Sequence, residues 1–179
     1  MNLLTTVGCG IPLFCLLILQ GGGPAIFFRS EKQVIFSNPQ SPDHFTLTAF
    51  GADTLDALVL FTIRNGKGNE IYRDSLTSVS FCGTGIDVDY PDDPALAPSA
   101  RRQFMVDGLK SFLADSNFVR PAVSAGEEIE PICTDSLAWI EFRQDLTVTA
   151  FGYHRFQDLR IGIAYSKLRS QVVHFTSEP

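Results

Sequence analysis

Four aspartates stand close together in one short segment and have the spacing of cation ligands. The segment reads Asp87-Val-Asp-Tyr-Pro-Asp-Asp93, and the four are Asp87, Asp89, Asp92 and Asp93. Ca²⁺ takes several oxygen ligands from flexible loops, and alternating aspartates can supply them. The segment lacks the glycine at position six and the distant glutamate of an EF-hand loop. These aspartates are therefore candidate calcium ligands, and the alternative is a solvated acidic loop with a turn at Asp93-Pro94.

The other ionisable side chains do not form a recognisable catalytic set. Glu127, Glu128 and Glu130 are adjacent in one loop, whereas acid–base catalysis needs two carboxylates in opposed environments. The chain has three histidines (His44, His154 and His174), and none has the close partner typical of a zinc site. No G-x-S-x-G motif supports a triad built on His154. We assign no catalytic residue and expect no cofactor.

Two of the four cysteines, Cys82 and Cys133, lie in the body of the chain. In an exported domain two such thiols usually pair, and the sequence therefore favours a Cys82–Cys133 disulfide. It would close a loop of about 50 residues, worth about 3–4 kcal/mol in the chain-entropy model. The alternative is two separate thiols in a reducing compartment.

The N-terminus carries an apolar stretch typical of export. Ile11–Leu19 is apolar, and Gly21-Gly-Gly-Pro-Ala25 supplies small residues for cleavage. No Lys or Arg precedes the apolar stretch, which leaves open a retained membrane anchor in place of a cleaved signal peptide. Thr6-Val-Gly-Cys9 resembles a lipobox without its usual leucine, so lipid modification is a further alternative. We expect residues 1–25 to be a signal peptide or anchor and residues 26–44 to be a linker.

The overall composition fits one acidic domain with a substantial core. The 179 residues are 45% hydrophobic and carry a formal net charge of −6. An acidic chain without a basic cluster argues against nucleic acid, because the phosphate backbone requires Lys and Arg. Phenylalanine is frequent, with 15 residues, which suits β-structure and a bulky core. We expect residues 45–179 to form a single domain.

A β-hairpin is the clearest structural pattern. Ala57–Arg64 is apolar on both faces, which predicts a central strand covered on both sides. Asn65–Asn69 contains two glycines and predicts a hairpin loop with a bulge. Glu70–Asp74 carries three charges and predicts a return strand near a sheet edge.

One segment has helical periodicity. Between Ser99 and Asn117, an apolar stripe recurs at helical spacing, formed by Met105, Leu109, Phe112 and Leu113. Gly108 weakens the helix by about 1 kcal/mol relative to Ala, which indicates a close approach to the sheet.

The remaining extended segments complete the predicted sheet. They are Phe45–Phe50, Val79–Cys82, Leu137–Phe142, Thr147–Tyr153, Leu159–Tyr165 and Gln171–Phe175. Short connections between the last four suggest antiparallel neighbours. We therefore expect an α+β fold, with an antiparallel β-sheet of about six to seven strands and one main helix packed on one face. Trp139, Tyr153 and Tyr165 are expected in the core, with the lining of a ligand groove as the alternative.

Three strings together resemble a known group of proteins. They are Gly68-Asn-Glu-Ile-Tyr-Arg-Asp-Ser75, Phe112-Leu-Ala-Asp-Ser-Asn-Phe118 and Ile163-Ala-Tyr-Ser-Lys167, followed by Val172-Val-His-Phe175. The pattern resembles small uncharacterised exported proteins and lipoproteins of Bacteroidetes-type bacteria. The resemblance implies a single exported domain and adds no catalytic residue.

These observations favour an exported, non-enzymatic binding or interaction domain, located in the periplasm, at the cell surface or in the medium. Its ligand is not identified by the sequence, and another protein is one candidate partner. The alternatives are a small extracytoplasmic hydrolase or ligand-binding enzyme, and a structural accessory protein tethered to a membrane by the N-terminal segment. A concave pocket with convergent polar groups would indicate a ligand site.

Overall fold

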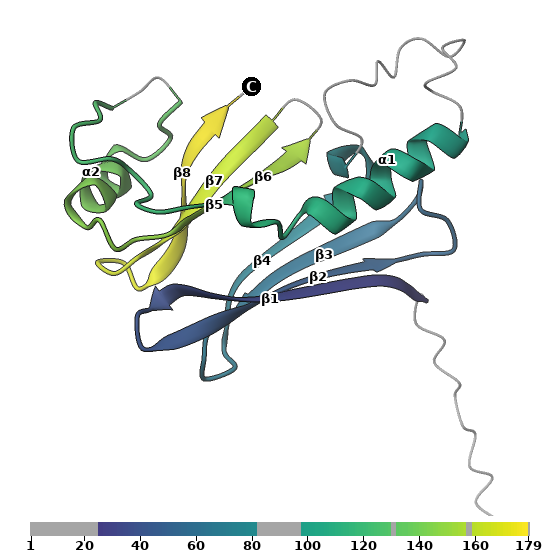
Figure 1. Cartoon of the computed structure of the whole chain (residues 1–179), viewed down its shortest axis with the longest axis horizontal. Helices are drawn as coiled ribbons and strands as arrows, with labels where there is room; N and C mark the ends of the chain where they lie inside the picture. The colour runs from purple at the N-terminus through teal and green to yellow at the C-terminus, as the bar shows by residue number, and fades with distance from the viewer. Residues whose placement is uncertain (1–24, 82–97, 130–131, 157–158, 179) are drawn as a thin grey trace, which may run out of the picture.

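The predicted hairpin forms one side of a four-stranded antiparallel sheet. The computed structural model describes residues 25–81, 98–129, 132–156 and 159–178, shown in colour in Figure 1. The first sheet has the order β1–β2–β3–β4, from β1 (Ile26–Asn38), β2 (Ser41–Phe50), β3 (Leu58–Arg64) and β4 (Glu70–Thr77). The edge position predicted for the return strand, β4, is confirmed.

The loop of the hairpin is held by Asn65. Its side-chain Oδ1 accepts hydrogen bonds from the backbone N–H groups of Lys67 and Asn69, each at 3.0 Å. Gly68 has a φ of +83°, a conformation that glycine adopts without steric cost. The register shifts between Ile63 and Arg64, which confirms the predicted bulge.

The first sheet is covered on one face, so the prediction that β3 is covered on both faces was wrong. Val59, Phe61 and Ile63 are fully buried, whereas Leu58 on the opposite face is 53% exposed. The outer face carries polar and charged side chains of the neighbouring strands, including Thr46. The apolar residues of one strand cannot show that its neighbours present polar groups on the same face.

Residues 26–44, expected to be a linker, form β1 and the start of β2. The two strands pair along most of their length, with Lys32 opposite Phe45. Phe28, Val34 and Phe36 of β1 pack on the core between exposed polar residues, which is the alternation of a strand with one buried face. The polar residues of this strand, rather than a lack of structure, gave the segment its linker-like composition.

The second sheet is also antiparallel and has four strands. Its order is β5–β6–β7–β8, from β5 (Phe118–Val119), β6 (Ala150–Phe156), β7 (Leu159–Ser166) and β8 (Gln171–Glu178). Among the described residues the fold is therefore α+β with eight strands in two sheets, and not the single sheet of six to seven strands that the sequence suggested. Short antiparallel connections have the same sequence pattern whether the strands form one sheet or two.

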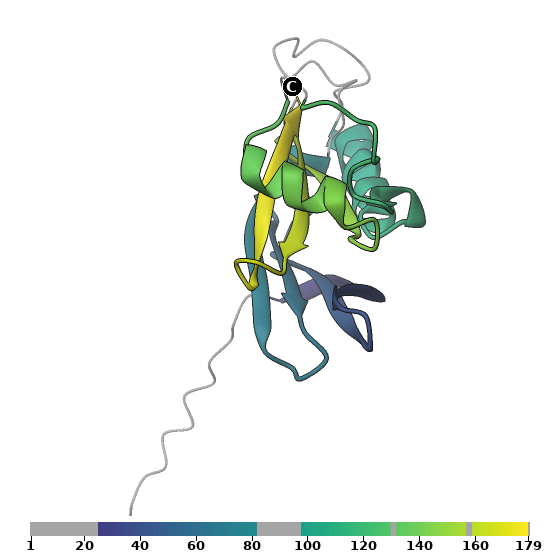
Figure 2. The same cartoon turned by 90° about the vertical axis from the view of Figure 1, so that its left-hand side faces the viewer.

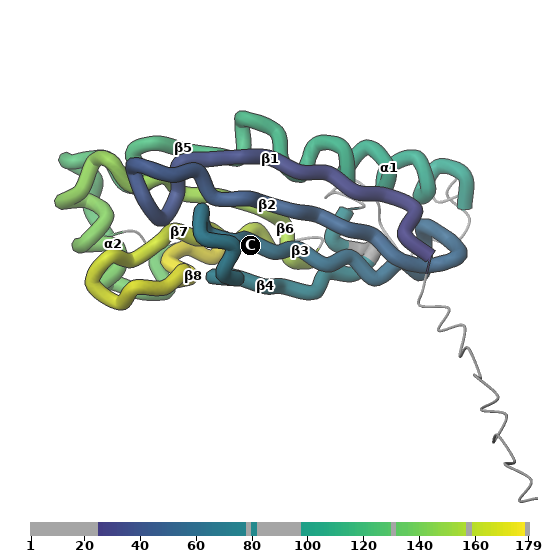
Figure 3. The backbone as a smooth tube through the Cα atoms, turned by 90° about the horizontal axis from the view of Figure 1, so that it is seen from below, coloured from purple at the N-terminus to yellow at the C-terminus, as the bar shows by residue number. Residues whose placement is uncertain are grey.

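The main helix, α1, spans Pro98–Ser111 and lies over the inner face of the first sheet beside the second sheet (Figures 1 and 3). Its predicted stripe is confirmed, because Met105, Leu109, Phe112 and Leu113 are all buried. The helix ends six residues earlier than expected. The side-chain amide of Asn117 donates to the carbonyl groups of Ser111 and Phe112, and so closes the helix end.

Leu137–Phe142, predicted to be a strand, lies within a second helix, α2 (Ser136–Gln144). Asp135 caps this helix, since its Oδ1 accepts a hydrogen bond from the Ala138 N–H at 3.0 Å. Trp139 and Phe142 are buried, while Leu137 is 70% exposed. Figure 2 shows α2 lying against the second sheet. No helix within the described residues is long and apolar enough to cross a membrane.

Val79–Cys82 was expected to continue the sheet, but Ser78–Phe81 forms the 3-10 helix η1. Gly108 of α1 approaches η1 closely, because a Cβ at Gly108 would lie 2.7 Å from the carbonyl oxygen of Phe81. The close approach indicated by Gly108 is therefore present, and it is made to η1 rather than to the sheet.

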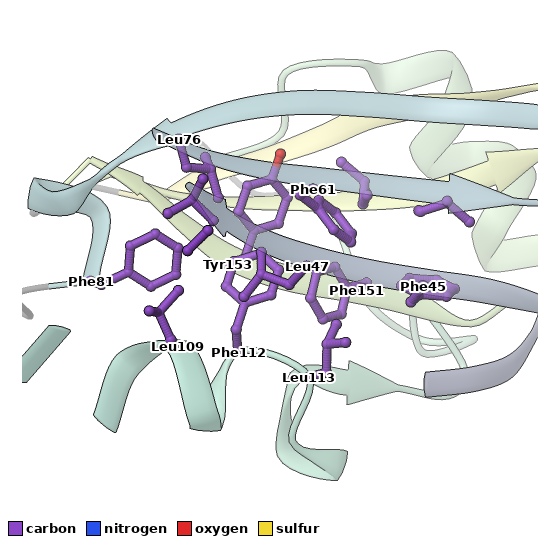
Figure 4. Packing of buried hydrophobic residues seen from close by; sticks show 14 of the residues in the cluster. Phe45, Leu47, Phe61, Leu76, Phe81, Leu109, Phe112, Leu113, Phe151 and Tyr153 are labelled. Atoms are coloured by element: carbon purple, nitrogen blue, oxygen red, sulfur yellow. The ribbon is translucent and has the colours of Figure 1, made fainter. Parts of the chain in front are cut away.

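Two hydrophobic clusters hold the layers together. The larger cluster joins the first sheet, α1 and the second sheet, and at its centre Phe61 contacts Phe112, Phe151 and Tyr153 at ring distances of 5.1–5.4 Å (Figure 4). The smaller cluster lies between α2 and the opposite face of the second sheet, and includes Trp139 and Phe175. The second sheet is thus covered on both faces.

Candidate ligand cavity

The predicted calcium and disulfide sites are not tested by the structure. Asp87, Asp89, Asp92, Asp93 and Cys82 lie outside the described residues. Cys133 is half-buried, and its backbone forms an isolated antiparallel β-bridge with Thr176 of β8. Within the described part of the chain, its thiol is free. Both sites therefore stay predictions.

A cavity of about 200 Å³ lies between α2 and the second sheet, and we call it the α2 cavity. It is partly open to solvent and is lined by one residue of α2, by residues of all four strands of the second sheet and by the segment that connects β5 to α2. Its lining residues are Val119, Ala122, Glu127, Ile132, Trp139, Ala150, Gly152, Arg160, Gly162, Phe175 and Thr176.

Two glycines form the floor of the α2 cavity. Gly152 of β6 and Gly162 of β7 are direct partners in the sheet. A Cβ at Gly152 would lie 2.5 Å from Nη2 of Arg160, and a Cβ at Gly162 would lie 2.2 Å from Oγ1 of Thr176. The absence of side chains therefore lets the Arg160 guanidinium lie over the backbone of β6 and the Thr176 hydroxyl over that of β7.

Arg160 also lines a second cavity of about 230 Å³ between α1 and β6, which we call the α1 cavity. Its wall includes Ser80, Phe81, Gly108, Ser111, Phe112, Asn117, Gly152, Tyr153, His154 and Arg160. Gly152 and Arg160 are common to both cavities. Arg160 therefore contributes to the lining of both cavities.

Trp139 lines the α2 cavity with part of its ring and has a buried donor. Its side chain is 2% exposed, and its Nε1 is buried without a hydrogen-bond partner within the described structure. A buried donor left unpaired costs about 1–3 kcal/mol.

The lining of the α2 cavity contains charged side chains of both signs. Arg160 supplies a positive charge and Glu127 a negative charge, and Thr176 adds a hydroxyl. Glu127 is held in place, because its Oε2 accepts from the Ser124 N–H at 2.9 Å and its carbonyl group accepts from Arg143 at 3.1 Å. The rest of the wall is mainly apolar, as in small-molecule binding sites.

A separate chain of hydrogen bonds joins the two sheets. The Tyr153 hydroxyl donates to Oδ2 of Asp74 at 2.7 Å, and it lies 2.7 Å from the Tyr72 hydroxyl. Tyr72 in turn lies 2.9 Å from Nε2 of His174. Because the Asp74 carboxylate can only accept, Tyr72 donates to Tyr153 and His174 donates to Tyr72. Arg155 also lies 3.5 Å from Asp74.

The electrostatics of this chain suit a structural role. Burial raises the pKa of Tyr72 to about 12 and raises the pKa of Tyr153 further, assisted by the neighbouring Tyr72 and Asp74. Burial also lowers the pKa of His174. A tyrosine that serves as a base or nucleophile needs a lowered pKa, so these groups are tuned in the opposite direction.

The other candidates from the sequence are dispersed. His44 lies on the outer face of the first sheet, and His154 is exposed beside the α1 cavity. Asp158 and Glu130 are outside the described residues. Tyr165 lines an open groove of about 610 Å³ between the β1–β2 and β3–β4 loops.

Sequence reasoning missed the floor and the cation of the α2 cavity. Trp139 was named as a groove candidate, and the structure places it both in the smaller core cluster and on the cavity wall. Gly152 and Gly162 were available as signals, because glycine inside a strand often marks a close approach by another group. Their pairing depends on the register between β6 and β7.

No family model, curated protein or solved structure matches this chain.

Proposed function

We propose that this chain is an exported, non-enzymatic binding domain that takes a small ligand in the α2 cavity. The observation that carries the proposal is the α2 cavity itself, about 200 Å³ in volume, whose lining combines apolar side chains with the charged residues Glu127 and Arg160 and the hydroxyl of Thr176. A few polar groups within a mainly apolar lining are typical of sites that bind small molecules. The N-terminal apolar segment supports the export part of the proposal.

Binding fits the wall better than catalysis does. The described lining residues include no cysteine, serine, histidine or lysine, and no hydrogen bond between described residues joins the Thr176 hydroxyl to the Glu127 carboxylate. A covalent mechanism would need a nucleophile beside a base. The cavity supplies charged, polar and apolar groups that can orient a ligand.

The test is a screen of small organic acids, alcohols and amides, read by the emission of Trp139, which is the only tryptophan of the chain. Ala122→Leu introduces a larger side chain into the cavity wall. Ala100→Leu on α1 is a matched control outside the wall. We expect members of the panel to change the emission in the wild-type protein and the control, and to lose their effect in Ala122→Leu.

Two results would contradict the proposal. One is that no member of the panel changes the emission of Trp139 at millimolar concentration. The other is that binding persists undiminished in Ala122→Leu while the protein remains folded, because the ligand would then lie elsewhere.

A further inference from the structure

We propose that a groove at one end of the two sheets binds an acidic polysaccharide, that is, a sugar chain that carries carboxylate groups. The groove lies between the β1–β2 turn, the β3–β4 hairpin loop and the end of β7, and we call it the loop groove. It consists of two adjoining hollows that share Ser37, Pro39, Tyr165 and Lys167, and the larger hollow is open to solvent. The loop groove has no lining residue in common with the α2 cavity, so this inference goes beyond the proposed function.

The charged side chains that line the loop groove are all basic. Lys67 and Lys167 line the larger hollow, and Arg120 lines the smaller hollow beside Lys167. No aspartate or glutamate is among the described lining residues, although the whole chain has 20 acidic and 14 basic residues. A positive surface on an otherwise acidic protein favours a negatively charged ligand.

Two of these cations have no partner within the described structure. Lys67 and Arg120 are exposed, and their side chains make no hydrogen bond or ion pair with another described residue. Lys167 differs, because its Nζ lies 2.6 Å from Oδ2 of Asp145. The attraction for an anion therefore rests on Lys67 and Arg120, which line adjoining hollows and suit a ligand with more than one charge.

The larger hollow also offers neutral donors for sugar hydroxyl groups. Asn38, Asn65 and Asn69 line it, and no side-chain NH₂ group of the three donates to another described residue. Oδ1 of Asn65 accepts from two backbone N–H groups of its own loop, and Oδ1 of Asn38 accepts from the Gln40 N–H at 2.9 Å. These hydrogen bonds orient the two amides and leave their donors for a ligand.

Tyr165 adds an aromatic ring to both hollows. The residue is partly buried, and its hydroxyl has no hydrogen bond within the described structure. A tyrosine combines an apolar ring, which can pack against the C–H groups of a sugar, with a hydroxyl that can bond to the sugar's own hydroxyl groups. The loop groove thus contains cations, neutral donors and an aromatic surface, which together match a sugar that carries a carboxylate.

An acidic peptide fits this groove less well. Extended peptides bind along free strand edges or place their side chains in apolar pockets. β7 is paired on both sides, and at the edge strand β1 the Ile35 carbonyl accepts from the Thr149 hydroxyl at 3.2 Å. In the larger hollow, the described residues with large apolar side chains are Pro39 and Tyr165. The lining therefore favours the sugar chain over the peptide.

The test is calorimetric titration of the full chain with oligogalacturonate, its methyl ester and oligo-L-glutamate. The ester keeps the sugar rings and removes the charges, whereas the peptide keeps the carboxylates and removes the sugar. We expect oligogalacturonate to bind about tenfold more tightly than the ester, because two exposed ion pairs of about two- to fivefold each are lost. It should also bind more tightly than the peptide, and added salt should weaken its binding.

Variants of the unpaired cations locate the ligand. Lys67→Gln and Arg120→Gln should each weaken the binding of oligogalacturonate about two- to fivefold and leave that of the ester unchanged. Lys110→Gln, at an exposed lysine of α1 outside the groove, is the matched control and should bind as the wild-type protein does. Asn69→Ala should weaken the acid and the ester alike, a result that attraction between charges alone would not produce.

Three results would overturn this inference. The first is that oligo-L-glutamate binds as tightly as oligogalacturonate, because the groove would then recognise carboxylates without the sugar. The second is that the double variant Lys67→Gln and Arg120→Gln remains folded and binds oligogalacturonate as the wild-type protein does. The third is that oligogalacturonate does not bind the wild-type protein at millimolar concentration. None of these results affects the proposed function, which is tested by substitution of Ala122 in the α2 cavity.

Discussion

Tyr153 contributes to the core with its ring and to the junction of the sheets with its hydroxyl. The ring lies 5.4 Å from those of Phe61 and Phe112, and the hydroxyl donates to the buried carboxylate of Asp74. Sequence analysis could assign Tyr153 to the core from its position on a strand. It could not find Asp74 as its partner, because the two residues are 79 positions apart and belong to different sheets.

Tyr153→Phe should destabilise the protein by about 1–3 kcal/mol, because it leaves the buried Asp74 carboxylate without this donor. Because the substitution retains the ring and its packing, the loss of unfolding free energy measures the contribution of the hydroxyl group. Urea unfolding measures the change. Tyr165→Phe is the control, since Tyr165 is only partly buried and has no side-chain hydrogen bond within the described structure. Equal effects of the two substitutions would show that the hydrogen-bond chain contributes nothing specific.

The stability should fall as the pH decreases below about 6.5, the ordinary pKa of histidine, because burial lowers the pKa of His174 in the folded protein. The unfolded chain then binds a proton that the folded protein resists. Melting temperatures at pH 7.5 and 5.5 measure this loss. Asp145, whose pKa is lowered to about 2 by Lys167 and Thr147, stays ionised throughout this range.

The loss between pH 7.5 and 5.5 should be smaller in His174→Gln, which keeps a donor for Tyr72. His44→Gln, on the outer face of the first sheet, should behave as the wild-type protein. A loss that is unchanged in His174→Gln, or reduced equally in His44→Gln, would contradict this assignment.

At the scale of elements, local patterns predicted the hairpin and α1 well. The hairpin has its own turn chemistry in Asn65–Asn69, and α1 has an apolar stripe that only a helical period explains. The segment Leu137–Phe142 was misassigned because nearly all its side chains are apolar, which fits either period. The cap at Asp135 was the available signal for a helix there.

Gly108→Ala should destabilise the protein by about 1–2 kcal/mol, although alanine has the higher helix propensity. The added Cβ would lie 2.7 Å from the Phe81 carbonyl oxygen, and a backbone group cannot easily move away. Chemical denaturation checks the sign of the change. Lys110→Ala, at an exposed position of the same helix, should change stability little. A more stable Gly108→Ala protein would show that η1 is free to shift away from α1.

At the scale of the whole molecule, the α2 cavity exists only after the elements have assembled. Its wall combines Trp139 of α2 with strand residues from Val119 to Thr176, and its floor depends on the register that pairs Gly152 with Gly162. The sequence supplied the residue types but neither the second sheet nor the face on which α2 packs. The candidate site could therefore be predicted only in part, through Trp139.

The most direct test of ligand binding in the α2 cavity is the indole N–H resonance of Trp139. The chain has a single tryptophan, so a ¹H–¹⁵N spectrum contains one such signal. On addition of a compound from the panel that binds, we expect this signal to shift and to saturate in the wild-type protein, because Trp139 lines the cavity. It should not move in Ala122→Leu. An indole signal that stays in place while the rest of the spectrum reports saturated binding would contradict the proposal.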